Sequence, residues 1–260
     1  SRASHCSGKG KAAMYVQTAR RADDASPIHS SSLGMGSEAA TLNCIFAAQV
    51  AERLEPGEAL FWQGDAANYV FEIVSGALRT IRVLSDGRRV ITGFLFAGDV
   101  VGVSLKDRYL TTVEAIAPTR VRRLARRRFD EEVERSATLR PQLLSRLCDE
   151  MTAAQDQVML LARKTAEERV ARFLLALARR GGDGCSCGAV VALPMTRLDM
   201  ADYLGLTIET VSRIMTRLTG RGIIAATGRH EISVRRPAAL AALAIDDEEE
   251  PTSHEVAWAY

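Results

Sequence analysis

Residues 196–220 read TRLDMADYLGLTIETVSRIMTRLTG, two short helical patterns on either side of a single glycine. Thr196 is a good N-cap for a helix over 197–204, because its hydroxyl can accept a hydrogen bond from a free backbone N–H of the first turn. Gly205 permits a sharp turn, and Thr207 caps a second helix that runs to about Arg221. Two short helices joined in this way predict a helix-turn-helix.

The second of these helices has an apolar face and a polar face. Residues three and four apart share one side of a helix. This spacing turns Val211, Ile214, Met215 and Leu218 inward, and Glu209, Ser212, Arg213 and Thr216 outward. A Glu209–Arg213 pair can simply stabilise a helix. In the recognition position of a helix-turn-helix it also suits base edges, because arginine binds guanine through two hydrogen bonds and a carboxylate accepts from cytosine N4.

Double-stranded DNA is therefore the expected partner of this segment. We predict three base-reading residues, Glu209, Ser212 and Arg213, and four contacts to phosphate or base, Thr207, Ile208, Thr210 and Arg229. The net charge of the chain is only +2, but the basic residues are concentrated. Residues 163–236 hold 13 basic and 7 acidic side chains, whereas 237–260 hold 6 acidic and no basic ones. An acidic tail thus masks a basic domain in the overall sum.

The distribution of residue types along the chain predicts an α+β protein of five parts. Residues 1–42 are rich in Ser, Ala, Gly and Arg and predict a flexible arm. Residues 43–128 hold short β-prone runs between glycines, typical of an antiparallel β-roll or jelly roll, with strands expected over 59–62, 69–74, 78–83, 90–96, 111–116 and 120–124. A long helix over 129–163 follows. A winged helix-turn-helix domain is expected over 164–236, beginning at a Thr165/Glu168 capping box and having wing strands over 223–226 and 231–234. An acidic tail over 237–260 follows it.

The long helix carries one narrow apolar stripe. Its members are spaced by three and four residues, as in the a/d seam of a coiled coil: Leu144, Leu147, Met151, Ala154, Val158 and Leu161. Such a stripe could pack on the chain's own barrel. Because it is narrow and flanked by charge, we expect it to be the interface of a homodimer.

Composition excludes several other classes of protein. No apolar run approaches the roughly 18 residues that a membrane helix needs, so no membrane partner is expected. Five scattered cysteines and no signal peptide indicate reduced thiols in the cytoplasm. Cys185 and Cys187 are either two loop thiols or a redox-sensitive pair. A dense arginine cluster at 120–128 is either a solvated face or a contact surface for bent DNA or RNA polymerase.

The glycine pattern and the second helix together resemble the CRP/FNR superfamily of bacterial transcription regulators over roughly 45–236. The resemblance rests on Pro56-Gly57-Glu58, Gln63-Gly64-Asp65, Asp86-Gly87-Arg88 and Gly98-Asp99-x-x-Gly102, and on the run from Leu204-Gly205-Leu206-Thr207 through Glu209-Thr210-Val211-Ser212-Arg213. That run is similar to the FNR and FixK branch. The resemblance implies a cyclic-nucleotide-binding-like roll, a dimerisation helix and a homodimer that binds a TTGA-N6-TCAA-like palindrome, with Glu209, Ser212 and Arg213 reading each half-site.

The same resemblance implies which effectors this chain lacks. FNR holds an iron–sulfur cluster through grouped cysteines, but here only Cys6 and Cys44 precede the roll and none lies between 45 and 147. Cyclic-nucleotide members have a Gly-Glu and an Arg-Ser/Thr-Ala stretch, where this chain has Gly98-Asp99 and residues 106–109, KDRY. No cofactor is therefore expected. What remains resembles the FixK type, activators that serve oxygen-limited respiration or nitrogen fixation and contact RNA polymerase.

One alternative to this interpretation stays open. A regulator of the same family gated by a small molecule or by thiol oxidation, with a different operator, would have the same architecture. An enzyme is not expected, although a β-roll is similar to a cupin, because metal-binding cupins use histidines and 43–128 contain none.

Overall fold

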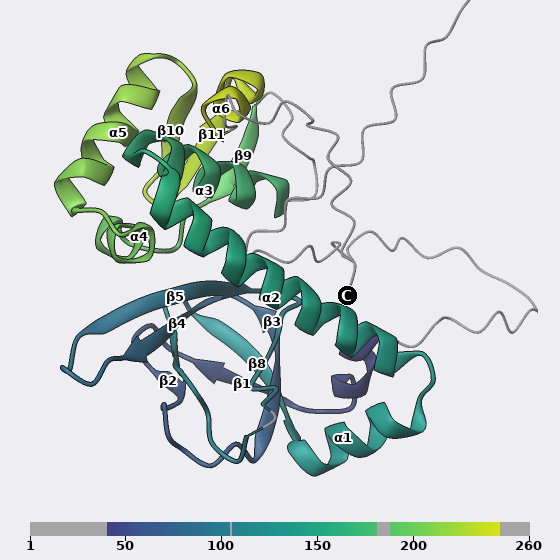
Figure 1. The fold of residues 1–260 in the computed structure, drawn as a ribbon. Helices are drawn as coiled ribbons and strands as arrows, with labels where there is room; N and C mark the ends of the chain where they lie inside the picture. The colour runs from purple at the N-terminus through teal and green to yellow at the C-terminus, as the bar shows by residue number, and fades with distance from the viewer. Residues whose placement is uncertain (1–40, 105, 181–187, 245–260) are drawn as a thin grey trace, which may run out of the picture.

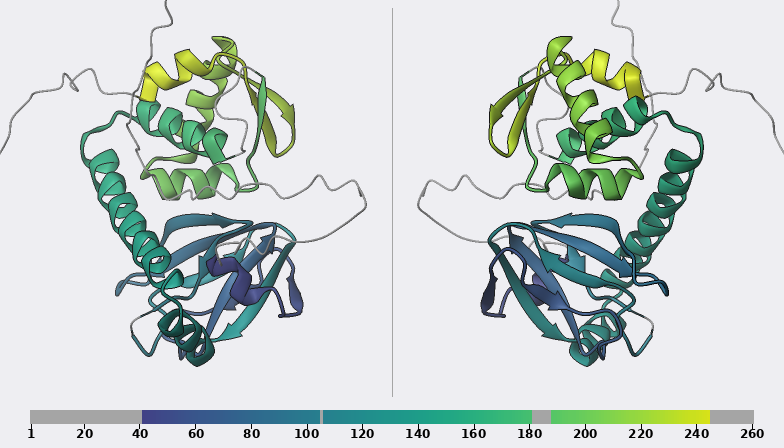
Figure 2. Two further views of the ribbon diagram at one scale, coloured as in Figure 1. Left: turned by 90° about the vertical axis from the view of Figure 1, so that its right-hand side faces the viewer. Right: turned by 90° about the vertical axis from the view of Figure 1, so that its left-hand side faces the viewer.

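A computed structural model describes residues 41–104, 106–180 and 188–244. It places a β-roll below a mainly helical domain, and one long helix runs along both (Figures 1 and 2). The predicted α+β architecture is confirmed. Of the predicted arm, 1–42, only the last two residues are described, and Leu42 is buried there against Phe46 and Phe129 rather than free.

Two antiparallel four-stranded sheets form the β-roll. One has the order β1-β8-β3-β6, with β1 Ala51–Leu54, β8 Thr119–Ala125, β3 Tyr69–Ser75 and β6 Val100–Val101. The other has the order β2-β7-β4-β5, with β2 Ala59–Phe61, β7 Thr112–Ala115, β4 Ala77–Val83 and β5 Arg89–Phe96. All six predicted strands are present. Two further strands were not predicted: β1, in which two of the four residues are charged, and β6, which has only two residues.

The segment predicted as one helix over 129–163 is two helices, so that prediction was wrong. Helix α1 spans Arg126–Arg135 and α2 spans Leu139–Arg163. Pro141 explains the break, because proline lacks an N–H and fits a helix only in its first turn. The chain therefore starts a new helix two residues before Pro141, with the Ser136 hydroxyl accepting from the Leu139 N–H at 3.2 Å.

The upper domain consists of four helices and a small three-stranded sheet. Helix α3 spans Ala166–Arg180, α4 spans Arg197–Leu204 and α5 spans Ile208–Gly220. The strands β9 Ala189–Ala192, β10 Ile224–Gly228 and β11 Glu231–Val234 form a sheet of order β10-β11-β9. The predicted capping box of α3 is present, since the Thr165 N–H donates to Glu168 at 2.8 Å.

The predicted acidic tail, 237–260, is corrected over its first part. Residues Pro237–Ala244 form helix α6, which packs on α3 and buries Leu240 completely. Proline at the first helical position followed by alanines and leucines favours a helix, a signal that the acidic run further on had obscured. Residues 245–260 lie outside the described residues.

None of the described helices combines the length and the apolar character that crossing a membrane requires.

The tight turn between β3 and β4 supplies a test of the fold. Gly76 has φ +93°, and a Cβ there would lie 2.4 Å from the Thr119 hydroxyl and 2.5 Å from the Pro118 carbonyl. We expect Gly76→Ala to lower the free energy of unfolding by more than the roughly 1–3 kcal/mol that a positive φ alone costs, because the backbone must also move. Urea denaturation measures this loss.

Gly57→Ala is the matched control. Gly57 has φ +91°, and a Cβ there would meet no other described atom within 4 Å, so this variant should show the conformational cost alone. Equal losses for the two variants would contradict the role given to the close approach at Gly76.

Candidate nucleic-acid interface

The two helices of the helix-turn-helix are held by hydrogen bonds within their own turns. Thr196 and Asp199 form a reciprocal capping box that starts α4. Gly205 ends α4 in the left-handed conformation at φ 62° and ψ 42°, which lets the chain turn into α5. The Thr207 hydroxyl then accepts from the Thr210 N–H at 3.2 Å. The predicted bounds of both helices are thus confirmed to within a residue.

One face of α5 is buried and the other is open to solvent. Val211, Ile214, Met215 and Leu218 are at most 5 % exposed and belong to the domain core. The predicted base readers Glu209, Ser212 and Arg213 lie on the exposed face, with Thr216. Thr207, Ile208 and Thr210 lie at the N-terminus of α5, where free N–H groups favour an anion. Arg229 is exposed at the end of the β10–β11 wing.

Glu209 and Arg213 keep their charged groups available. Within the described residues, Arg213 has no acidic partner within 4 Å, so the simple helix-stabilising pair is not formed at contact distance. The pKa of Glu209 lies below its ordinary value because the carboxylate accepts from its own backbone N–H and from Thr207, and because Arg213 is near. An ionised carboxylate and a free guanidinium therefore point away from the core side by side.

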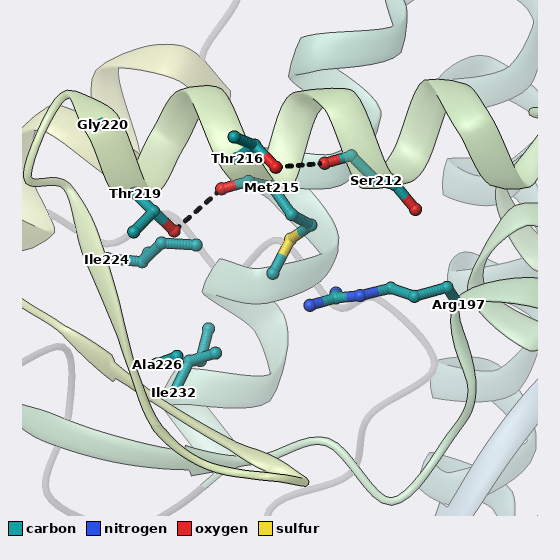
Figure 3. A pocket seen from close by; sticks show the side chains of 9 residues that line it. All are labelled: Arg197, Ser212, Met215, Thr216, Thr219, Gly220, Ile224, Ala226 and Ile232. Carbon is teal, nitrogen blue, oxygen red and sulfur yellow. Dashed lines mark hydrogen bonds between the residues drawn. The ribbon is translucent and has the colours of Figure 1, made fainter.

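A cavity of about 510 Å³ lies beside the exposed face of α5. Figure 3 shows residues from α4, α5 and the wing around it: Arg197, Ser212, Met215, Thr216, Thr219, Gly220, Ile224, Ala226 and Ile232. Arg197 was not predicted as part of this surface. Its guanidinium reaches toward Met215 in Figure 3, and burial lowers its pKa. A helical wheel of α5 could not reveal it, because Arg197 comes from the neighbouring helix.

The arginine cluster at 120–128 is largely a network of ion pairs. Arg122 binds Glu72 at 3.1 Å, Arg123 binds Glu52 at 3.2 Å and Arg127 binds Glu131 at 3.1 Å. Arg126 lies 3.8 Å from Asp130, and the Arg123 guanidinium also stacks over the Tyr69 ring. Mutual neutralisation of this kind favours the solvated face over a polyanion-binding surface.

Side chains fill the interior of the roll. The rings of Phe61 and Tyr109 stack at 3.8 Å between centroids, and Phe71 lies 5.8 Å from Phe61. The Tyr109 hydroxyl donates to the Tyr69 carbonyl at 2.7 Å, which anchors the ring. Asp99 faces away from this interior and pairs with Arg180 of α3 at 2.7 Å. Among the described residues, no three His, Cys, Asp or Glu side chains gather as metal ligands.

The apolar stripe of α2 is open to solvent in the single chain. Leu144, Met151 and Val158 are 60–65 % exposed, Leu161 is 40 % exposed, Ala154 is exposed and Leu147 is half-buried. The helix contacts its own chain through Leu139, Ala153 and Leu160 instead. The stripe thus does not pack on the chain's own barrel. Cys185 and Cys187 lie outside the described residues.

Comparison with known proteins gives two family matches and many relatives. Residues 51–136 match the cyclic nucleotide-binding domain, and residues 168–243 match the Crp-like helix-turn-helix domain. The nitrogen fixation regulation protein FixK of Bradyrhizobium diazoefficiens is 40 % identical over 192 residues, which cover 72 % of this chain and 79 % of the relative. The transcriptional activator protein FnrA of Stutzerimonas stutzeri is 39 % identical over 193 residues, 74 % of this chain and 79 % of the relative.

A solved structure agrees with these relatives. The structure of FixK2 from Bradyrhizobium japonicum superimposes with a TM-score of 0.71 at 36 % identity, covering 76 % of this chain and 98 % of that one. The fold, the open face of α5 and relatives of this similarity together show that the chain belongs to the CRP/FNR family of DNA-binding transcription regulators and is of the FixK type.

Proposed function

We propose that this protein is a cytoplasmic transcription activator that binds as a homodimer to a TTGA-N6-TCAA-like palindrome. The exposed face of α5 carries the proposal, because it presents Glu209, Ser212 and Arg213 together at the start of a helix whose other face is fixed in the core. The names of the relatives, nitrogen fixation regulation protein and transcriptional activator, support control of nitrogen fixation or oxygen-limited respiration.

Each half-site is read by the N-terminal half of α5. Arg213 hydrogen-bonds guanine O6 and N7, Glu209 accepts from cytosine N4, and Ser212 contacts a neighbouring base. Thr207, Ile208 and Thr210 bring the helix N-terminus to the phosphate backbone, and Arg229 reaches it from the wing. Arg197 adds a positive charge in the groove between α5 and the wing.

Two copies associate along α2. The stripe of Leu144, Leu147, Met151, Ala154, Val158 and Leu161 repeats with the 3-4 spacing of a coiled-coil seam, and most of it is exposed in one chain. Two-fold symmetry then places the recognition helices in successive major grooves, about 34 Å apart. RNA polymerase is the further partner that activation requires.

DNA binding in this proposal needs no effector. Phe61, Phe71 and Tyr109 occupy the inside of the roll, and Tyr109 is tied to the backbone of Tyr69, so the sheet faces already contact one another. Gating by a small molecule would require these rings to move apart.

The test is a titration of reduced full-length protein against a TTGA-N6-TCAA duplex and a scrambled duplex at one fixed salt concentration, with and without cAMP. Salt is fixed because phosphate contacts alone change affinity by orders of magnitude. Tight, selective binding that cAMP does not alter is expected. Equal weak binding to both duplexes, or selectivity that appears only with cAMP, contradicts the proposal.

Arg213→Ala should weaken binding to the palindrome by about 1–3 kcal/mol and relax the preference at one guanine position. Among the described residues the guanidinium forms no ion pair at contact distance, so its removal breaks no such pair within the chain. Competition with singly substituted duplexes measures it. Arg217→Ala on the same helix is the control, because Arg217 binds Glu167 at 2.9 Å, and its base preference should stay that of the parent protein. Unchanged discrimination in Arg213→Ala would remove it as a base reader.

Met151→Glu should convert the dimer to monomers that bind the palindrome poorly. A carboxylate in the middle of an apolar seam loses hydration and faces its own symmetry mate. Light scattering gives the oligomeric state, with Ser145→Glu as the control at an exposed position of α2 outside the stripe. A full-strength Met151→Glu dimer would show that the chains associate through another surface.

A further inference from the structure

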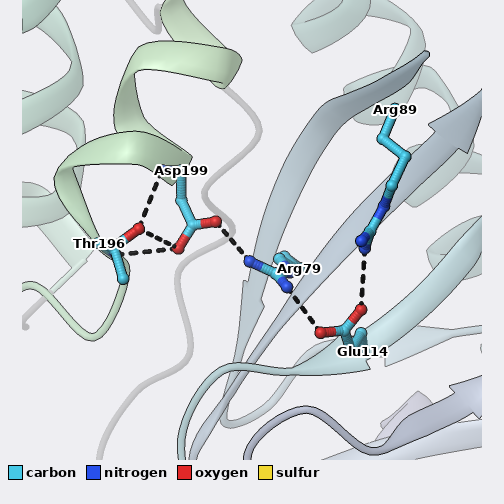
Figure 4. A network of polar contacts seen from close by, with 5 residues as sticks. All are labelled: Arg79, Arg89, Glu114, Thr196 and Asp199. Carbon is cyan, nitrogen blue, oxygen red and sulfur yellow. Dashed lines mark hydrogen bonds and ion pairs between the residues drawn. The ribbon is translucent and has the colours of Figure 1, made fainter. Parts of the chain in front are cut away.

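The helix-turn-helix is fastened to the β-roll by a polar network centred on Arg79. Arg79 projects from β4, and its guanidinium binds Glu114 of β7 at 2.6 Å with one nitrogen and Asp199 of α4 with another. Glu114 also binds Arg89 of β5 at 3.1 Å. Figure 4 shows the chain of contacts running from the sheet across the domain boundary to the first turn of α4.

Asp199 is the junction of this network. One carboxylate oxygen accepts from the N–H and hydroxyl of Thr196, at 2.9 and 2.8 Å, and so closes the capping box of α4. The other oxygen is bound by Arg79. Asp199 is only 4 % exposed, so the ion pair is shielded from solvent. The Asp199 carboxylate thus caps the first helix of the helix-turn-helix and also binds that helix to the roll.

Additional contacts surround this attachment. Phe94 of β5 packs against Tyr203 of α4 and Phe173 of α3, with ring centroids 5.4 and 5.9 Å apart. Arg180 at the end of α3 pairs with the buried Asp99. At the joint between α2 and α3, the Arg169 guanidinium donates to the carbonyls of three residues, Leu161, Lys164 and Leu204. The helix-turn-helix domain is thus held in this position by contacts with the roll and by hydrogen bonds at the connection between α2 and α3.

These contacts bear on the spacing between half-sites that a dimer can bind. Inserting one base pair between two half-sites shifts one of them by about 3.4 Å and rotates it by roughly 35° about the DNA axis. A domain connected to α2 only by a flexible linker of residues 164 and 165 could follow that movement. A domain tied to the roll on one side and to α2 on the other cannot, unless it breaks these contacts.

We infer that Arg79, through Asp199, is a specificity-determining residue that sets the spacing between half-sites and leaves the choice of bases to α5. This inference rests on the proposed function, since it requires a homodimer on an inverted repeat. The outer face of the β2-β7-β4-β5 sheet, which carries Arg79, then influences DNA recognition without contacting DNA.

The experiment compares the binding of full-length protein to palindromes with spacers of five, six, seven and eight base pairs, and to a six-base-pair palindrome with one substituted guanine. The parent protein should prefer one spacer by a hundredfold or more. Arg79→Gln should reduce that preference at least tenfold, while the penalty for the substituted guanine stays within twofold. A merely structural defect would weaken binding to every duplex alike.

Arg89→Gln is the matched control. It also removes an arginine charge bound to Glu114, but among the described residues Arg89 forms no ion pair or hydrogen bond with the helix-turn-helix, so the spacing preference should persist. Asp199→Asn, which keeps an oxygen for the cap of Thr196, should relax spacing like Arg79→Gln, and provides the measurement if Arg79→Gln does not fold. Loss of spacing preference in Arg89→Gln too, or its retention in Arg79→Gln and Asp199→Asn, overturns the inference.

The outcome for the parent protein separates the two hypotheses. If it prefers no palindrome over scrambled DNA, the proposed function itself fails. If it binds the palindrome selectively but tolerates all four spacers equally, the proposed function stands and the spacing inference fails.

Discussion

Phe94 occupies the contact on which the arrangement of the two domains depends. It lies on the outer face of a sheet of the roll, together with Ile81 and Ile91, and these three side chains belong to the same buried core as α3, α4 and α5. Burying an aromatic or branched aliphatic side chain is worth about 1.5–3 kcal/mol. The helix-turn-helix domain therefore cannot separate from the roll without exposing apolar surface of both domains. Helix α2 has 25 residues and is long enough to run beside both of them.

The strands beneath this contact contribute to two structures at once. In β4, Leu78 points into the roll and Arg79 points toward α4, because successive side chains of a strand alternate between its faces. The inner face is covered by an aromatic group around Tyr109, and the outer face carries the charges of Arg79, Glu114 and Arg89 beside the apolar contact made by Phe94. Neighbouring residues of β4 thus have different tasks, since Leu78 packs inside the roll and Arg79 binds the helix-turn-helix.

Local signals predicted most of the helix-turn-helix. Thr196, Gly205 and Thr207 mark the ends of α4 and α5, because caps and turns depend on neighbours within three residues, and the periodicity of α5 separates Val211 from Arg213 correctly. The same logic failed where a stronger signal lay nearby. The acidic run after Ala244 obscured α6, and the long helical pattern around Pro141 masked the break between α1 and α2.

Contacts between distant segments could not be predicted in this way. Arg79 and Asp199 are 120 residues apart, and neither stands in a motif that names the other as its partner. Arg197 was missed for the same reason, since its position beside α5 follows from the crossing of two helices. The arginines at 120–128 have the composition of a basic patch in sequence, but the acids that neutralise several of them, Glu52 and Glu72, lie on other strands.

The exposed stripe of α2 also determines how the number of dimers depends on the amount of protein. In the proposed homodimer each chain must meet another before Leu144, Met151 and Val158 are covered, so at low abundance the number of dimers rises with the square of the number of chains. Doubling synthesis then gives up to four times as many dimers that can occupy an operator. Such a regulator can in this way respond sharply to its own rate of production.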